Sequence, residues 1–464
     1  MSYLPHTPEE RTEMLDVIGV ASVDELFANV PESLRSGEPN IGKGMSELEV
    51  VRLLDGLQAQ NLDLEHRPSF LGGGAYQHYV PSAVPAITGR SEFYTSYTPY
   101  QPEVSQGTLQ VIYEFQTMIA ELMGLDISNA SLYDMATAVA EACTIAINET
   151  RRSRVLVAAG VHPDSRQVVA TYMRAQGFEC VDLGEDWTID VERAGQLIDE
   201  SIAGVVVQSP NFWGAIEPMQ ELCEAAHRSG ALFIAAVNPL SLALLAPPGE
   251  YGADIGVGCG QPLGVSLSYG GPYLGLIAVR EGLERRLPGR IAGATQDSRG
   301  RKGYVLTLQA REQHIRREKA TSNICTNHQL MALAATVYLS LLGKEGLREL
   351  AALCLRRAHY AAEMVTGLDG FGIAFEAPFF NEFTVKTPVP AAEINRHLLN
   401  AGIIGGLDLG QIDERLDHFL TLAVTEMNDR EQIDDLVETL RSLEPVEASV
   451  AEADLQGAGA GGRS

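Results

Sequence analysis

Short apolar runs alternate with helical segments across the middle of this chain. The runs Val155–Ala159, Gly204–Gln208 and Leu232–Val237 have the length and composition of buried strands. Because strands that are buried on both faces and alternate with helices form parallel sheets, the pattern predicts an α/β fold, with a mostly parallel central sheet and helices on both faces. The other expected elements of this region are the strands Cys180–Leu183, Ile255–Gly258 and Leu274–Val279 and the helices Asp164–Gln176, Val191–Ser201 and Ile216–Ser229.

The regions on either side of this sheet predict further parts. Thr7 and Ser46 are each followed by Glu three positions later, which is the capping box that starts a helix. Beyond Thr326 the chain is mainly helical to Gly367 and then becomes βαβ-like. We therefore expect an N-terminal helical segment (1–65), a large domain (66–326), a smaller C-terminal α+β domain (327–445) and a disordered tail (446–464). The βαβ-like stretch comprises Phe383–Lys386, Ala391–Ala401, Leu420–Val424 and the helix Asp429–Leu443.

Composition narrows the class of protein. The 464 residues include 61 acidic and 34 basic side chains, so the net charge is −27 and no nucleic-acid partner is expected. No run of eighteen apolar residues is present, which argues against a membrane partner. The six cysteines are scattered without a C-x-x-C pair, so neither a disulfide framework nor a metal site is expected. The N-terminus has no apolar leader, and a cytoplasmic location is the expectation.

The most informative segment is Ala253–Gly275, which reads ADIGVGCGQPLGVSLSYGGPYLG. Its strand, glycine-rich loop and second strand have the shape of the segment that carries the cofactor lysine in one large group of pyridoxal-phosphate (PLP) enzymes. At the place of that lysine stand Gln261 and Pro262, and neither has the primary amine that a Schiff base needs. None of the five lysines of the chain follows this strand; they are Lys43, Lys302, Lys319, Lys344 and Lys386.

A second cofactor-holding group is also absent. In catalytic PLP scaffolds an Asp near the end of a central strand pairs with the ring nitrogen of the cofactor. The candidate strand here, Ala231–Val237, is followed by Asn238 and Pro239; Asn is neutral and Pro has no N–H donor. The two absences together predict that this chain does not itself hold PLP.

A tyrosine-rich segment forms the first candidate site. Residues 94–103 read YTSYTPYQPE, and Pro99 and Pro102 keep the segment extended. Tyrosines on a rigid segment suit a pocket wall or a protein interface. An Ω-like surface loop is the alternative. The candidate residues are Tyr94, Tyr97, Thr98, Tyr100, Gln101 and Glu103.

Positive charge is concentrated in the segment Arg285–Lys319. It holds ten basic and three acidic side chains, a net charge of +7 in a strongly acidic chain. We expect a basic helix here that faces a phosphate, a carboxylate or an acidic subunit. A solvated helix face with local ion pairs is the alternative. The candidate residues are Arg311, His314, Arg316, Arg317 and Lys319.

A polar loop, Ala320–His328, lies between this basic segment and an apolar helix expected over Asn327–Leu342. Its hydroxyl and amide side chains suit a phosphate cradle. An N-capping turn has the same composition, so the sequence leaves both interpretations open. The candidate residues are Thr321, Ser322 and Asn323.

Three long stretches carry a family resemblance: residues 94–110, 253–275 and 303–327. The third of them ends in TSNICTN. Together they resemble the alpha-subunit branch, glycine dehydrogenase (decarboxylating) subunit 1, of the glycine cleavage system P-protein family. The likeness runs from about residue 1 to about residue 445. One departure is His328, where the family pattern has Gln.

The resemblance implies a PLP-dependent transferase architecture of fold type I and an α2β2 heterotetramer with a beta subunit. PLP would be held by the beta subunit, and this chain would close the active-site gorge from across the interface with its tyrosine segment. Thr321, Ser322 and Asn323 would reach the phosphate of the partner-bound PLP. With the beta subunit the enzyme would decarboxylate glycine and transfer the aminomethyl group to the lipoyl arm of H-protein.

Two other functions are open at this point. One is a catalytically silent scaffold or regulatory subunit of a PLP enzyme. The other is a self-sufficient PLP enzyme with an unusual lysine such as Lys319, against which the missing lysine and Asp both count. The polar and tyrosine-rich loops favour an active-site subunit over a scaffold, because a scaffold has little need for them.

Overall fold

The computed structural model describes residues 6–37, 40–184 and 187–443 and divides the chain into two compact units, one ending at Asp63 and one beginning at Leu64. The first unit contains helices α1 (Pro8–Ile18) and α2 (Glu47–Gln58). Both expected capping boxes are confirmed, at Thr7 and at Ser46. Neither helix has a buried residue, so local capping rather than packing supports them. The expected tail, 446–464, lies outside the described residues.

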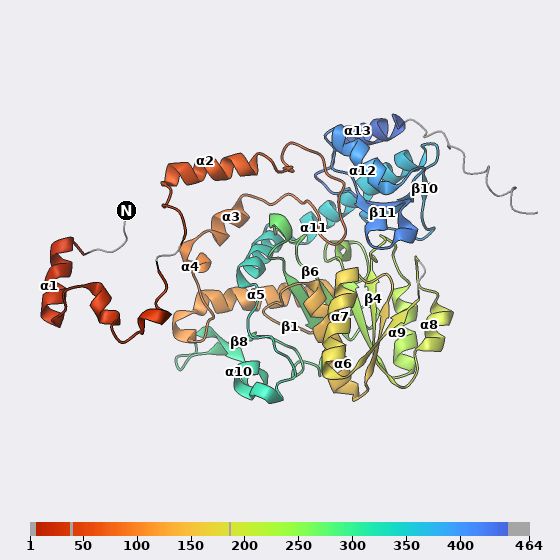
Figure 1. The fold of residues 1–464 in the computed structure, drawn as a ribbon. Helices are drawn as coiled ribbons and strands as arrows, with labels where there is room; N and C mark the ends of the chain where they lie inside the picture. The colour runs from red at the N-terminus through yellow and green to blue at the C-terminus, as the bar shows by residue number, and fades with distance from the viewer. Residues whose placement is uncertain (1–5, 38–39, 185–186, 444–464) are drawn as a thin grey trace, which may run out of the picture. The chain divides into compact units, whose positions relative to one another are not determined.

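A seven-stranded sheet forms the centre of the second unit, with strand order β1-β7-β6-β5-β4-β2-β3 (Figure 1). The pairs among β2 to β6 are parallel, while β7 runs antiparallel to both β6 and β1. The mostly parallel sheet is therefore confirmed. Its strands are β1 (Ile127–Ser128), β2 (Arg154–Ala158), β3 (Glu179–Leu183), β4 (Ile202–Ser209), β5 (Leu232–Val237), β6 (Ile255–Cys259) and β7 (Gly275–Val279).

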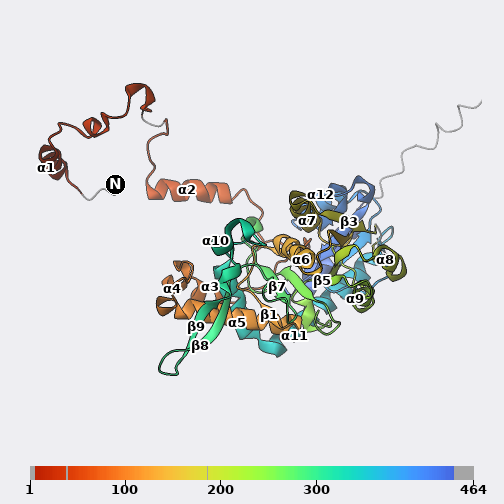
Figure 2. The same cartoon turned by 90° about the horizontal axis from the view of Figure 1, so that it is seen from below.

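Helices cover both faces of this sheet. The chain moves from β2 to β3 in one direction across the sheet and from β3 to β4 and then β5 in the opposite direction. Because crossovers between parallel strands are right-handed, the helix between β2 and β3 lies on one face, and the helices that lead to β4 and to β5 lie on the other. Figure 2 shows α6 and α7 on one side of the strands and α8 and α9 on the opposite side. The helices of this region are α3 (Ala83–Thr88), α4 (Ser91–Tyr94), α5 (Gln106–Met123), α6 (Met135–Thr150), α7 (Pro163–Gln176), α8 (Val191–Leu197) and α9 (Met219–Arg228).

Helix α6 was not expected from the sequence pattern. Its ten buried residues form the unbroken run Ala138–Ile147. A helix that is enclosed on nearly all sides has no polar face and so no amphipathic period, which is why the periodicity did not reveal it.

The smaller sheet has strand order β10-β11-β13-β12, and every neighbouring pair is antiparallel. The stretch was described from the sequence as βαβ-like, and its strands near residues 383 and 420 pair antiparallel, as β11 with β13. The parallel counterpart of β11 is the short β12, and β13 is inserted between the two, which makes a split βαβ unit. The elements are β10 (Gly372–Ile373), β11 (Glu382–Lys386), α12 (Ala391–Asn400), β12 (Leu407–Asp408), β13 (Phe419–Ala423) and α13 (Arg430–Arg441).

The basic segment is not the helix that was expected. It forms a hairpin of β8 (Ile291–Gln296) and β9 (Lys302–Thr307), followed by the short helix α10 (Gln313–Arg316) between two three-residue 3-10 helices. Asp297 closes the hairpin turn, since its carboxylate accepts hydrogen bonds from the backbone N–H groups of Arg299 and Arg301.

Helix α11 (Gln329–Thr366) connects the large and small sheets and kinks at Gly343, where φ is +59° and ψ is −172°. By length and apolar composition it is the one helix among the described residues that could cross a membrane. Core helices of globular proteins meet the same criterion. Because α11 packs against α5 and α13 and buries residues such as Tyr338 and Cys354, its apolar character is explained by the core.

Candidate functional site

Gln261 lies just beyond the end of β6 and is buried, with only 1% of its surface exposed. Its Oε1 accepts a hydrogen bond from the Tyr76 N–H at 2.9 Å. Its Nε2 donates to the Tyr76 carbonyl at 2.8 Å and to the Val265 carbonyl at 2.9 Å. At the place of a cofactor lysine, this chain therefore has a side-chain clamp that holds the backbone of a distant loop. Pro262, beside it, is also buried.

Two neighbouring features also oppose cofactor binding by this chain. Asn238 follows β5, and its side-chain oxygen accepts a hydrogen bond from the Leu240 N–H at 3.0 Å, so no charged group stands there. Helix α6 begins near the end of β6, but its first turn is capped by the Asp134 carboxylate, which accepts from the Thr137 N–H at 2.8 Å. A carboxylate at a helix N-terminus repels a phosphate instead of binding it. A lysine-held PLP does not fit these residues.

The tyrosine segment and the start of α11 form one pocket. Tyr94, Tyr97 and Thr98 line it from one side, and Thr326 and Asn327 line it from the other. Its volume is about 140 Å³. Two stretches that the sequence singled out separately are thus brought together.

The tyrosines of this pocket are unusually open. Tyr94 is 66% exposed and Tyr97 is 83% exposed. Gln101 and Glu103 are also exposed and do not line the pocket. Large exposed aromatic side chains on a proline-braced segment are typical of a surface that binds a partner.

Tyr100 contacts a residue that the candidate set did not include. The guanidinium carbon of Arg290 lies 5.6 Å from the centre of the Tyr100 ring, and the Arg290 Nη2 donates to the Tyr100 hydroxyl at 3.4 Å. The ring of His314 meets the same tyrosine edge-on, with a centroid distance of 6.2 Å. No local pattern in the sequence marks Arg290, because its contact with Tyr100 joins residues that are 190 positions apart.

The five basic candidates separate into two groups. Arg311 is partly buried, donates from Nη1 to the Leu287 carbonyl, and has a pKa that burial lowers against the opposing charge of Glu312. His314 lies 3.6 Å from the Glu312 carboxylate. The remaining three are exposed and form no common binding surface that the structure defines; they are Arg316, Arg317 and Lys319.

The loop at residues 321–323 faces α6 and α7. Ser322 accepts a hydrogen bond from the Ile324 N–H at 3.0 Å. Burial raises the pKa of Glu141 to about 7, and the neighbouring Ser322 side chain opposes this shift. Burial raises the pKa of Tyr172 and the Asn323 side chain opposes this shift, while Thr321 is exposed. The helix-cap interpretation is wrong, because the residue that precedes α11 is His328 and it makes no side-chain capping bond.

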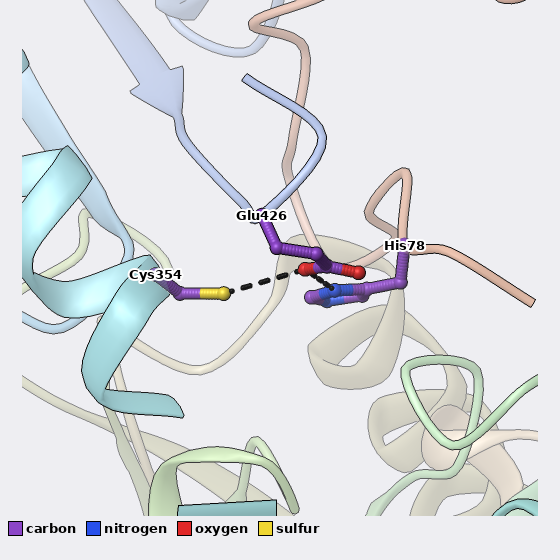
Figure 3. Close-up of side chains that lie close together, drawn as sticks. All are labelled: His78, Cys354 and Glu426. Atoms are coloured by element: carbon purple, nitrogen blue, oxygen red, sulfur yellow. Dashed lines mark hydrogen bonds and ion pairs between the residues drawn. The ribbon is translucent and has the colours of Figure 1, made fainter. Parts of the chain in front are cut away.

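A buried cluster of His78, Cys354 and Glu426 is the one group among the described residues whose side chains could together hold a metal ion (Figure 3). Glu426 accepts from His78 Nδ1 at 2.7 Å, from the Cys354 thiol at 3.4 Å and from the Tyr79 N–H at 2.7 Å. Burial raises the pKa of Glu426, but the hydrogen bond and charge of His78 oppose it and hold the pKa below its usual value. The cluster is thus a hydrogen-bonded junction that joins the loop near residue 78 to helix α11 and to the segment after β13.

A second buried carboxyl joins the same loop to β11. Glu382 accepts from the Gly73 N–H at 2.6 Å and from the Tyr76 hydroxyl at 2.5 Å. Burial raises the pKa of Glu382 to about 7, against the effect of both hydrogen bonds. Since Tyr76 is also held by Gln261, one loop is bonded both to β11 and to the segment that follows β6.

This carboxyl makes stability depend on pH. Because the pKa of Glu382 is raised in the folded state, the protonated carboxyl stabilises the folded chain. This stabilisation is fully present below the ordinary pKa of about 4.5 and is lost as pH rises through about 7. We expect the free energy of unfolding to fall between pH 5 and pH 8, and Glu382→Gln to remove on the order of 3 kcal/mol of that fall. Urea unfolding at both pH values checks this, with Glu92→Gln, on the exposed surface, as the control. Parallel pH profiles for wild type and Glu382→Gln would contradict the prediction.

Sequence comparison identifies the family over nearly the whole chain. The family model described as glycine cleavage system P-protein matches residues 1–440. The probable glycine dehydrogenase (decarboxylating) subunit 1 of Desulfitobacterium hafniense is 52% identical over 439 residues, which cover 94% of this chain and 98% of that protein. The protein of the same description from Moorella thermoacetica is 52% identical over 445 residues, which cover 96% of this chain and 100% of that protein.

Structural comparison agrees. The crystal structure of glycine decarboxylase (P-protein) of the glycine cleavage system, in inhibitor-bound form, has a TM-score of 0.88 at 45% identity and covers 95% of this chain and 99% of its own. The Lactobacillus brevis glutamate decarboxylase shares the fold alone, with a TM-score of 0.66 at 12% identity over 89% of this chain and 96% of its own. The expected PLP-dependent fold type I architecture is confirmed. The chain therefore belongs to the glycine cleavage system P-protein family, among its subunit 1 members.

Proposed function

We propose that this chain is the subunit of glycine decarboxylase that holds no PLP and completes the active site from across an interface. The partner is a beta subunit of similar fold, which carries PLP on a lysine, in an α2β2 heterotetramer. The observation that carries this division of roles is the Gln261 clamp, because it occupies the lysine position with a fully hydrogen-bonded, buried amide. A cytosolic location is part of the proposal and is supported by six cysteines that are all free.

In this arrangement PLP, when bound to the partner, supplies the electron sink for loss of CO2 from glycine. This chain supplies the opposite wall of the gorge. Its exposed tyrosines, Tyr94 and Tyr97, exclude water from that wall and orient what enters, and Asn327 adds a fixed polar group because its Nδ2 is anchored to the Ala130 carbonyl at 2.9 Å. The lipoyl arm of H-protein is the proposed acceptor of the aminomethyl group.

A silent scaffold remains the competing function. It would explain the lost lysine, but it gives no reason for large tyrosines held open to solvent beside a polar pocket. The difference is testable, because a scaffold tolerates changes in the pocket that leave assembly intact.

Reconstitution tests the proposal. This chain and a beta subunit are purified separately, and glycine–bicarbonate exchange is measured with lipoylated H-protein. We expect exchange only from the mixture, and a borohydride-reduced PLP adduct only on the beta subunit. Light scattering on the same mixture should report a heterotetramer. A stoichiometric adduct on any lysine of this chain, or full exchange by the beta subunit alone, would overturn the proposal.

A further inference from the structure

Arg290 is a buried cation that has no anionic partner among the described residues. Only 3% of its surface is exposed. Its Nε is buried and has no hydrogen-bond partner within the described part of the chain. The one side-chain bond that it does make is long, 3.4 Å from Nη2 to the Tyr100 hydroxyl. Buried charges in proteins are ordinarily paired, so this guanidinium requires an explanation.

The contact with Tyr100 offsets only part of the cost of this burial. Its ring lies 5.6 Å from the guanidinium carbon, which is within cation–π range. Removing a guanidinium from water costs more than such a contact returns. The arrangement is therefore one in which a neutral ring covers a cation that remains without a counter-charge.

A second guanidinium nearby is also incompletely bonded. Arg311 donates from Nη1 to the Leu287 carbonyl, three residues before Arg290, while its Nε and Nη2 are buried and have no partner in the described chain. The acid beside it is Glu312, whose Oε1 is likewise unpartnered and whose Oε2 lies 3.6 Å from His314. Over Arg290, Arg311 and Glu312, three unpartnered donor atoms thus stand against one unpartnered acceptor atom.

Tyr100 is positioned to uncover these donors. It is 50% exposed, and its neighbours Tyr97 and Val104 are 83% and 80% exposed. Pro99 and Pro102 brace the backbone of this segment, but the Tyr100 ring is half exposed, so rotation of the side chain alone can move the ring aside. When the ring moves aside, the free Nε edge of Arg290 presents the planar fork that binds two oxygens of one anion.

We propose that Arg290, supported by Arg311, binds a small oxyanion in the assembled enzyme and that Tyr100 covers it in the free chain. The inference rests on the proposed function, since the oxyanion comes from the shared active site. Two sources share this chemistry: the carboxylate of glycine and the phosphate of the partner-held cofactor. Both present a pair of oxygens that can accept hydrogen bonds from two N–H groups on one edge of a guanidinium.

The free chain provides the first test. Thermal unfolding is followed with acetate or inorganic phosphate as probes, against chloride at equal ionic strength. Tyr100→Ala should bind a probe at least tenfold more tightly than wild type, and the double variant Tyr100→Ala/Arg290→Met should lose that gain. Arg290→Met alone should unfold at the same or a higher temperature than wild type, because it removes an unpaired buried charge. Equal probe binding by the single and double variants would overturn the proposal.

The assembled enzyme provides the second test and identifies the source. Arg290→Met should raise the KM for glycine at least tenfold if the anion is the substrate carboxylate, or weaken PLP retention at least tenfold if it is the phosphate; either result supports the proposal. Arg290→Lys should recover part of the loss. Unchanged KM and unchanged PLP retention would overturn the proposal. In that case a less stable variant would make Arg290 a structural residue, and a variant that assembles less tightly would make it an interface residue. An inactive wild-type mixture counts against the proposed function, while the probe measurements on the free chain still decide the role of Arg290.

Discussion

Replacing Gln261 with alanine is expected to lower the free energy of unfolding by about 3–5 kcal/mol. The change removes three hydrogen bonds from a site that is 1% exposed and leaves backbone groups of Tyr76 and Val265 without these partners. Urea unfolding of the isolated chain measures the loss. Gln309→Ala is the matched control, because Gln309 is exposed and makes a single bond of 3.3 Å to the Leu306 carbonyl; it should cost less than about 1 kcal/mol.

Restoring the lysine should not restore cofactor binding. Gln261→Lys supplies an amine but cannot accept the Tyr76 N–H, and it places a charge where a neutral amide was buried. Asp134 still caps α6 and Asn238 still follows β5. We expect a destabilised chain without the visible absorption of an internal aldimine. A stable variant in which borohydride traps PLP on residue 261 would show that the lysine alone was missing.

The sequence predicted what Gln261 cannot do chemically, but it did not predict the structural role of this residue. The identity of residue 261 alone shows that it cannot form a Schiff base, because a Gln side chain has no primary amine. That its amide clamps Tyr76 depends on a contact across 185 residues, which no local pattern records. The same holds for Arg290, since its burial arises from the fold around Tyr100, 190 residues earlier.

Errors in the predicted elements have comparable causes. The apolar runs predicted the parallel strands well, because a strand buried on both faces has an unmistakable composition. The basic segment was assigned to a helix on its charges, although Asp297 and Gly300 marked the hairpin turn between β8 and β9. Short strands such as β12 were missed because two residues carry no periodic signal.

The tyrosine pocket leads to the second large expected effect, a loss of activity without a loss of stability. Tyr97 is 83% exposed, so Tyr97→Ala should change the free energy of unfolding of the isolated chain by less than about 0.5 kcal/mol. If its ring forms a wall of the shared site, the reconstituted enzyme should lose roughly 10- to 100-fold in glycine–bicarbonate exchange. The combined change with Tyr94→Ala should lose more.

The control and the readout decide what such a loss means. Leu399→Ala removes a side chain that is 43% exposed on α12, away from the pocket, and should leave exchange unchanged. Light scattering distinguishes a failed assembly from a defective site. A heterotetramer that forms normally but exchanges slowly assigns the tyrosines to the active site, because an interface residue would act through assembly. Full exchange by the Tyr94/Tyr97 double variant would instead make residues 94–103 an ordinary surface loop and would favour the scaffold function.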